Sequence, residues 1–225
     1  MSGRGPVVAV DGPSGSGKST VSRHLAVALG THYLDTGAMY RAVTWVVLQA
    51  DVDPHDADTV HKIAAETQLS LGTDPMDPHI TVDGTNVDGP IRRPEVTAAV
   101  SAVAAVPAVR HLLVARQREI VAAARTESGI VVEGRDIGTV VCPDADLKVF
   151  LTASAHERAR RRSVEHAADL DATAEDLARR DRLDSTRAVD PLAQAPDAVV
   201  LDSTELGVDE VVARLVELVR GRLPG

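Results

Sequence analysis

Positive charge, cysteine and long apolar runs are all scarce in this chain, and each shortage excludes a class of protein. Lysine and arginine total 24 against 33 acidic residues, which leaves a formal net charge of −9. An acidic chain lacks the basic face that a nucleic-acid groove requires, so we expect no nucleic-acid partner. The arginines that are present cluster at 158–162 and 179–187, which favours a small anionic ligand.

The single cysteine and the short apolar runs both indicate in which cellular compartment the protein is expected. Cys142 has no second cysteine with which to form an internal disulfide, which suits a reducing cytosol. It lies beside Pro143 at the end of an apolar run, so we expect a buried side chain and not a catalytic thiol. No run reaches the roughly 18 apolar residues of a membrane helix, and the N-terminal run is too short for a signal peptide. We therefore expect a cytoplasmic protein with no membrane partner.

What the chain does contain is an alternation of short apolar runs with helical patterns. The apolar runs are rich in β-branched residues, as strands covered on both faces are, and lie at 6–10, 32–35, 130–133, 147–151 and 197–202. Helical patterns lie at 18–29, 36–49, 94–105, 108–126, 154–168, 173–187 and 208–222. This alternation predicts an α/β fold with a parallel sheet flanked by helices, and 225 residues suit one such domain with an insertion.

One segment, QLSLGTDPMDPHITVDGTNVDGPIRR at 68–93, departs from this alternation. It has short alternating runs and two turn signals, Asp83-Gly84 and Asp88-Gly89. Such a pattern predicts a small antiparallel β insertion. The alternative is an irregular surface loop.

The stretch VVAVDGPSGSGKST at 7–20 carries the most specific motif. Gly12 to Ser19 matches G-x-x-x-x-G-K-[ST], and it follows a predicted strand and opens a predicted helix. The glycines let backbone amides close around phosphate oxygens, and the helix N-terminus favours negative charge. Lys18 is expected to reach the β and γ phosphates, and the Ser19 hydroxyl to bind Mg²⁺. The predicted ATP site comprises Gly12, Pro13, Ser14, Gly15, Ser16, Gly17, Lys18, Ser19 and Thr20.

Two other classes of nucleotide-binding protein are excluded by what the chain lacks. A guanine reader of the N-K-x-D type needs asparagine before lysine, and the only asparagine, Asn86, precedes Val87. No D-x-x-G switch motif occurs. A motor or remodelling ATPase needs more chain than 225 residues supply beyond the core.

Residues that could hold a phosphate acceptor follow the second and third predicted strands. Loops at the carboxyl ends of parallel strands line the ligand crevice of such folds. Thr36 and Tyr40 could touch the acceptor, although capping of the helix and core packing are the alternatives. Arg135 and Asp136 supply an anion anchor and a hydrogen-bond acceptor, with a mutual surface ion pair as the alternative.

Two arginine-rich helical segments complete the set. Arg180, Asp184 and Arg187 share one helix face at i, i+4 and i+7, a spacing that a solvated, salt-bridged helix would also show. Arginines at 158–162 suit a mobile lid that stabilises the transferring phosphoryl group and excludes water. Those that point outward are expected to be solvated. We place Arg158 and Arg162 with the ATP site.

In this order, the stretches DGPSGSGKST, DTGAMYRAV, SAVAAVPAVR, EGRDIGTVV, RDRLDSTRAVDPL and AVVLDST resemble the bacterial cytidylate kinases. These belong to the nucleoside monophosphate kinase group of P-loop kinases. The resemblance implies Mg²⁺-dependent transfer of the γ-phosphoryl group of ATP to CMP or dCMP by a monomer. It implies one domain over 1–225, with a core at 1–66, 94–154 and 172–225, an acceptor-binding β insertion at 67–93 and a lid at 155–171.

The resemblance also assigns roles to residues. Ser101, Arg110 and Asp136 would read the cytosine, with Tyr40 against the base. Thr36 would lie near the sugar and phosphate, and stands where some members carry serine. The sugar would be held by Arg180 and Asp184, and the acceptor phosphate by Arg41, Arg135 and Arg187. The expected catalytic set is Lys18, Arg135, Asp136 and Arg187.

Two rival functions remain open at this point. A small-molecule kinase of the same fold that acts on AMP, UMP or shikimate would share the ATP site and differ in its acceptor pocket. A non-enzymatic ATP-binding regulatory module would bind ATP and release no ADP. The dense arginine set weighs against the second rival, because sensing needs no cluster of charges around a transition state.

Overall fold

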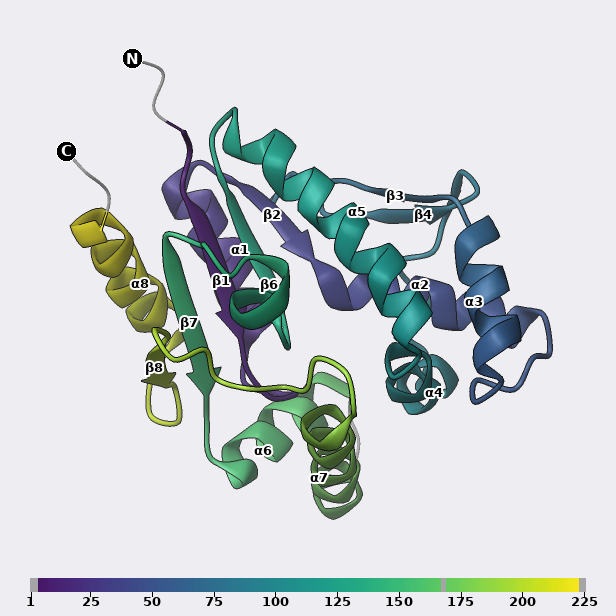
Figure 1. Ribbon diagram of the computed structural model, residues 1–225. Coiled ribbons are helices and arrows are strands. Elements are labelled where there is room, and N and C mark those ends of the chain that lie inside the picture. The colour runs from purple at the N-terminus through teal and green to yellow at the C-terminus, as the bar shows by residue number, and fades with distance from the viewer. Residues whose placement is uncertain (1–3, 167–168, 223–225) are drawn as a thin grey trace.

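The computed structural model describes residues 4–166 and 169–222, and its core is the predicted parallel sheet (Figure 1). The sheet has five strands in the order β2-β6-β1-β7-β8, and every neighbouring pair is parallel. The strands are β1 (Val7–Asp11), β2 (His32–Asp35), β6 (Ile130–Gly134), β7 (Leu147–Thr152) and β8 (Val199–Asp202). The predicted fold class is confirmed.

Helices cover both faces of this sheet, which explains why its strands are continuous apolar runs. On one face Val8 and Val10 of β1 pack with Leu25 of α1 and Leu215 of α8. On the other face alternate residues of β1 pack against α5, which crosses the front of the sheet in Figure 1. The helices are α1 (Lys18–Leu29), α2 (Thr36–Gln49), α3 (Ala57–Glu66), α4 (Pro94–Ala104), α5 (Pro107–Arg125), α6 (Ala155–His166), α7 (Leu170–Thr186) and α8 (Val208–Arg222).

The segment at 68–93 forms the small antiparallel sheet that its turn signals predict. Strands β3 (Leu69–Leu71), β4 (Ile80–Val82) and β5 (Thr85–Asn86) pair in that order. Asp83 and Gly84 both have positive φ, 49° and 79°, as a two-residue hairpin turn requires. Ile80 and Val82 are buried against α2, so this segment is an ordered layer and not a loose loop.

Three elements were not predicted from the sequence, and one of them is a short 3₁₀ helix at Pro90–Arg92 that follows β5. Helix α3 places Val60, Ile63 and Ala64 at i, i+3 and i+4 on one packed face, a helical pattern that was overlooked because it covers little more than one turn. A π-helical turn at Ile137–Val141 follows β6, where the apolar composition gives no sign of irregular winding. The buried carboxylate of Asp11 accepts hydrogen bonds from the amides of Ile137 and Gly138 at 2.8 and 2.7 Å, which anchors this turn to the end of β1.

The helices at the predicted lid differ slightly from expectation. Helix α6 ends at His166 and α7 runs from Leu170 to Thr186, so Arg187 is the residue after α7 and not its last turn. Of the predicted lid at 155–171, residues 167–168 lie outside the described residues. Among the described residues, no single helix is long and apolar enough to span a membrane; α4 and α5 reach that length only together, across a 98° bend.

Candidate active site

A crevice of about 630 Å³ opens at the carboxyl ends of β1 and β6. Most of the predicted site residues line it: Ser14, Gly15, Ser16, Gly17, Lys18, Ser19, Thr20, Thr36, Tyr40, Arg41, Ser101, Arg135, Asp136, Arg162, Arg180, Asp184 and Arg187. The structure does not place Gly12, Pro13, Arg110 or Arg158 in the lining. Segments far apart in sequence thus meet around one cavity, as expected at a point where strand order reverses.

The loop between β1 and α1 has the backbone of a phosphate cradle. Gly12, Gly15 and Gly17 have φ values of 152°, 76° and 87°, which residues with a Cβ rarely adopt. A Cβ on Gly12 would also lie 2.0 Å from the carbonyl oxygen of Leu151. The glycines of the motif are therefore required by the loop itself, and the amides behind them lead directly into α1.

Lys18 lies folded over this loop. Its Nζ donates to the carbonyl oxygen of Pro13 at 2.7 Å and to Ser16 Oγ at 3.4 Å. Burial and the nearby guanidinium of Arg135 lower the pKa of Lys18 to about 7. A bound polyphosphate would restore the charge of this ammonium group, because opposite charge favours the ionised form.

A carboxylate that sequence reasoning missed faces the expected metal-binding hydroxyl. Ser19 Oγ donates to Glu133 Oε2 at 3.0 Å, and the Tyr33 hydroxyl donates a short hydrogen bond to Glu133 Oε1. Burial raises the pKa of Glu133 to about 7, and the carboxylate of Asp35 adds to this rise. Glu133 is the penultimate residue of β6 and directly follows the apolar residues 130–132, and an acid near a buried strand end was the available signal.

Thr36 does not cap helix α2, which was the alternative to its touching the acceptor. The N-cap of α2 is Asp35, whose carboxylate accepts from the amide of Ala38 at 3.0 Å. Thr36 Oγ1 instead donates to the carbonyl oxygen of Glu133 at 2.7 Å. The capping interpretation of Thr36 was wrong because the carboxylate of Asp35, one residue earlier, caps the helix by accepting from the amide of Ala38.

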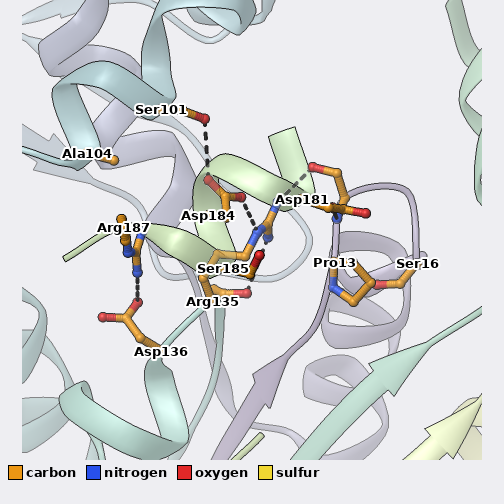
Figure 2. Close-up of polar contacts among 12 residues, drawn as sticks. Pro13, Ser16, Ser101, Ala104, Arg135, Asp136, Asp181, Asp184, Ser185 and Arg187 are labelled. Atoms are coloured by element: carbon orange, nitrogen blue, oxygen red, sulfur yellow. Dashed lines mark hydrogen bonds and ion pairs between the residues drawn. The ribbon is translucent and has the colours of Figure 1, made fainter. Parts of the chain in front are cut away.

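Arg135 connects the phosphate loop to helix α7 across the crevice (Figure 2). Its Nη2 donates to Ser14 Oγ at 2.8 Å, and its Nε to Asp184 Oδ2 at 3.0 Å. Asp184 also accepts from Ser101 Oγ at 3.3 Å. The alternative of a mutual surface pair between Arg135 and Asp136 is wrong, since Arg135 pairs with Asp184.

Asp136 belongs to a separate charged cluster. It accepts a short hydrogen bond from Arg110 Nη2, and its Oδ1 lies 3.5 Å from Arg187 Nη2. The Arg110 guanidinium is fully buried, 5.5 Å above the centre of the Tyr40 ring. Because Arg110 does not line the crevice, it can act on a ligand only through Asp136 and Tyr40 as the side chains stand.

Several buried groups near the crevice have polar atoms that make no hydrogen bond within the described part of the chain. Arg180 Nε, Arg187 Nη2 and the Tyr40 hydroxyl make no hydrogen bond among the described residues. Burial lowers the pKa of Arg180 to about 9, and Arg135 and Arg41 lower it further by like-charge repulsion. Burial also lowers the pKa of Arg41 to about 10. Crowded, desolvated guanidinium groups of this kind suit an anion that would pair with them.

The arginines of α6 divide into two groups. Arg158 Nη1 donates to the carbonyl oxygen of Ser14 at 2.9 Å and pairs with Asp181 of α7, so it braces the outside of the phosphate loop. Arg160, Arg161 and Arg162 line the crevice. Arg160 and Arg161 pair with Glu157. The Arg160 side chain is largely exposed, as expected for an arginine of this segment that points outward.

The segment after β8 is a further part of the crevice that sequence reasoning missed. Ser203, Leu206, Gly207 and Val208 line its side next to α1. Ser203 Oγ donates to the carbonyl oxygen of Ser16 at 3.4 Å, which attaches this segment to the phosphate loop. Cys142 is buried, as expected, and desolvation raises its pKa to about 12.

Comparisons with known proteins agree with this geometry. A family profile described as cytidylate kinase matches residues 8–221. The cytidylate kinase of Streptomyces griseus subsp. griseus is 55% identical over 217 residues, which cover 96% of this chain and 93% of that protein. The cytidylate kinase of Rhodococcus opacus is 53% identical over 228 residues, with 99% and 98% covered.

A solved structure shows the same fold. An uncharacterized protein from Eubacterium ventriosum aligns with a TM-score of 0.55 over 96% of this chain and 99% of its own. Its sequence identity is 9%, so this likeness concerns the arrangement of helices and strands alone.

Proposed function

Because the chain belongs to the cytidylate kinase family, we propose that its crevice transfers the γ-phosphoryl group of ATP to CMP or dCMP, giving CDP or dCDP. The observation that carries this proposal is the set of buried guanidinium groups facing the phosphate loop. Arg180 and Arg187 keep nitrogen atoms without hydrogen-bond partners among the described residues, and Arg135 bridges the two sides. A second phosphate opposite the first would satisfy these donors.

The acceptor nucleotide would lie between α2, α4 and the C-terminal end of α7. Asp136 would accept a hydrogen bond from the exocyclic amino group of cytosine, with Ser101 at the base and Tyr40 against its face. Arg180 and Asp184 would hold the sugar. Arg41, Arg135 and Arg187 would bind the phosphate, with Thr36 beside it. Arg41 already ties α2 to the β insertion by donating to the carbonyl oxygen of Ile91 at 3.3 Å.

The residues around Ser19 fit a magnesium ion. Mg²⁺ prefers oxygen donors and usually takes only one or two from protein, with phosphates and water completing its shell. The Ser19 hydroxyl and the Glu133 carboxylate are such a pair, with Asp35 close by. When bound, the ion would neutralise charge on the β and γ phosphates.

The chain would contribute mainly position and charge to the reaction. Phosphoryl transfer spreads negative charge over the oxygens of the migrating group, and fixed cations in a dry site stabilise it. Lys18 and Arg135 reach that region from the donor side and Arg187 from the acceptor side. The attacking oxygen of a nucleoside monophosphate is already largely ionised near neutral pH, so no side chain has to remove a proton.

We also propose separate roles for two segments of the domain. The β insertion at 67–93 would serve acceptor binding, and the segment at 155–171 would act as the lid that brings Arg162 and its neighbours over ATP. The proposed working form is a monomer. A cytoplasmic location would supply both nucleotides.

ADP release with ATP and Mg²⁺ tests the activity against CMP, dCMP, UMP, AMP, GMP and shikimate. We expect rapid turnover with CMP and dCMP and little with the others. A preference for AMP, UMP or shikimate would keep the phosphoryl transfer and contradict the acceptor pocket. No turnover with any acceptor, together with retained ATP binding, would contradict the kinase and favour a regulatory module.

The pH profile should report on Glu133. Its ionised form is the one that can face Mg²⁺, and its pKa is raised to about 7, so kcat/KM for ATP should fall as pH falls through about 7. The Tyr33 hydrogen bond lowers this pKa. Tyr33→Phe should therefore move the acid limb to higher pH, by about one pH unit. The comparison is between kcat/KM profiles of the two proteins, and superimposable profiles would contradict the role of Glu133.

A further inference from the structure

Asp190 lies in the connection between α7 and β8, within the stretch RDRLDSTRAVDPL, and the family resemblance assigns it no role. Its carboxylate Oδ2 accepts from Arg110 Nε at 2.8 Å, and its backbone carbonyl accepts from Arg187 Nε at 2.6 Å. The two partners are 80 and 3 residues away along the chain. One residue therefore holds both the buried arginine behind the base site and the arginine assigned to the acceptor phosphate.

The backbone at Asp190 is shaped for this double contact. Its φ is +48°, in the left-handed region that aspartate tolerates better than most residues other than glycine. Two residues later, the amide of Leu192 donates to the carbonyl oxygen of Asp184 at 2.8 Å, which folds the connection back onto the end of α7. The turn thereby carries the Asp190 side chain inward toward α5.

Asp190 belongs to a cluster of two arginines and two aspartates whose formal charges sum to zero: Arg110, Asp136, Arg187 and Asp190. Arg110 and Arg187 lie close enough that each guanidinium disfavours the charge of the other, and Asp136 offsets both. Asp190 supplies the second negative charge, with its side chain one quarter exposed at the edge of the group. A fully buried Arg110 without this partner would leave an uncompensated donor, which is costly, so its guanidinium would reorient.

Reorientation of Arg110 would be transmitted to the crevice. Arg110 donates to Asp136, and it stacks over Tyr40, and both of these residues line the crevice. A carboxylate at Asp136 favours cytosine, whose ring position 4 carries an amino donor, over uracil, which carries a carbonyl oxygen there. The strength of that preference depends on where the Asp136 oxygens point.

We propose that Asp190 is a positioning residue that sets the discrimination between acceptor bases, acting through Arg110 on Asp136 and Tyr40. This inference rests on the proposed CMP kinase activity. It adds a residue outside the crevice lining to those that determine specificity, and it makes the α7–β8 connection part of the acceptor site.

The test compares kcat/KM for CMP with that for UMP in wild type and three variants. Asp190→Gly removes the carboxylate and keeps the left-handed backbone, so we expect the CMP-to-UMP ratio to fall about tenfold, the value of one hydrogen bond to a charged group. Asp190→Asn retains an oxygen acceptor and should recover most of the ratio. KM for ATP should change by less than about twofold in both.

Asp197→Ala is the matched control, because it removes an aspartate of the same connection that pairs with Lys148 and does not line the crevice. It should leave the ratio unchanged. An unaltered ratio in folded Asp190→Gly, or an equal rise of KM for ATP and CMP, overturns the proposal. If that variant does not melt cooperatively, Asp190→Ser, too short to reach Arg110, takes its place. If the wild-type protein does not phosphorylate CMP, the result would instead contradict the proposed kinase activity itself.

Discussion

Lys18→Ala is expected to lower kcat by about a thousandfold, the largest effect of any single substitution in the crevice. Lys18 is the cation of the phosphate loop, and its buried Nζ is held over the loop by the Pro13 carbonyl oxygen. No other lysine can replace it, since Lys62 and Lys148 lie outside the crevice lining. Single-turnover phosphoryl transfer from ATP to CMP measures the loss directly.

Stability separates this catalytic effect from misfolding. Burial lowers the pKa of Lys18 to about 7, so the folded protein holds an ammonium group that would be better solvated in the unfolded chain. Its removal should therefore leave the melting temperature unchanged or slightly higher. Lys62→Ala, on the exposed side of α3, provides the control with unaltered kcat. A Lys18→Ala enzyme that keeps more than about a tenth of kcat would contradict the role of Lys18 in the transfer.

Arg187→Ala should reduce kcat about a hundredfold and raise KM for CMP, while ATP affinity stays within about twofold. Arg187 is nearly buried, its Nη2 has no hydrogen-bond partner among the described residues, and its Nε is fixed by the Asp190 carbonyl oxygen. It is thus oriented before the acceptor arrives. Because we propose that Arg187 binds the acceptor phosphate, its loss should affect transfer and acceptor binding but not donor binding.

The measurements are steady-state kinetics with CMP varied and calorimetric titration of ATP. Arg182→Ala offers a matched control, because Arg182 is an exposed arginine of α7 that does not line the crevice. It should behave as wild type. Equal losses in turnover and in ATP affinity for Arg187→Ala would show that the substitution disturbs the donor site, and would contradict an acceptor-side role.

The fold class and the donor site could be predicted from the sequence because both depend on local signals. Strands covered on both faces must be apolar throughout, so five short runs indicated the parallel sheet. The phosphate loop needs glycine at positions of positive φ, and Gly12, Gly15 and Gly17 adopt such φ values. Helix α3 was not predicted although Val60, Ile63 and Ala64 share one packed face, because this apolar pattern covers little more than one helical turn.

The pairing of charged groups could not be predicted in the same way. The sequence placed Arg135 next to Asp136, yet Arg135 pairs with Asp184, 49 residues later. The family resemblance assigned Arg110 to the base, yet the fold surrounds its guanidinium with Asp136 and Asp190 outside the crevice lining. Adjacent residues on a strand end point in different directions, so neighbours in sequence need not be partners in space.

What the sequence by itself determined is which side chains are available and where along the chain they stand: a glycine-rich loop with Lys18 and Ser19, and arginines after each later strand. Only the tertiary structure decided which of these arginines keep free donors and which are neutralised by protein carboxylates. The physical reason is that Coulomb and hydrogen-bond energies in a desolvated site depend on ångström-scale distances. Those distances arise from the packing of α4, α5 and α7 around the sheet edge, which no local pattern specifies.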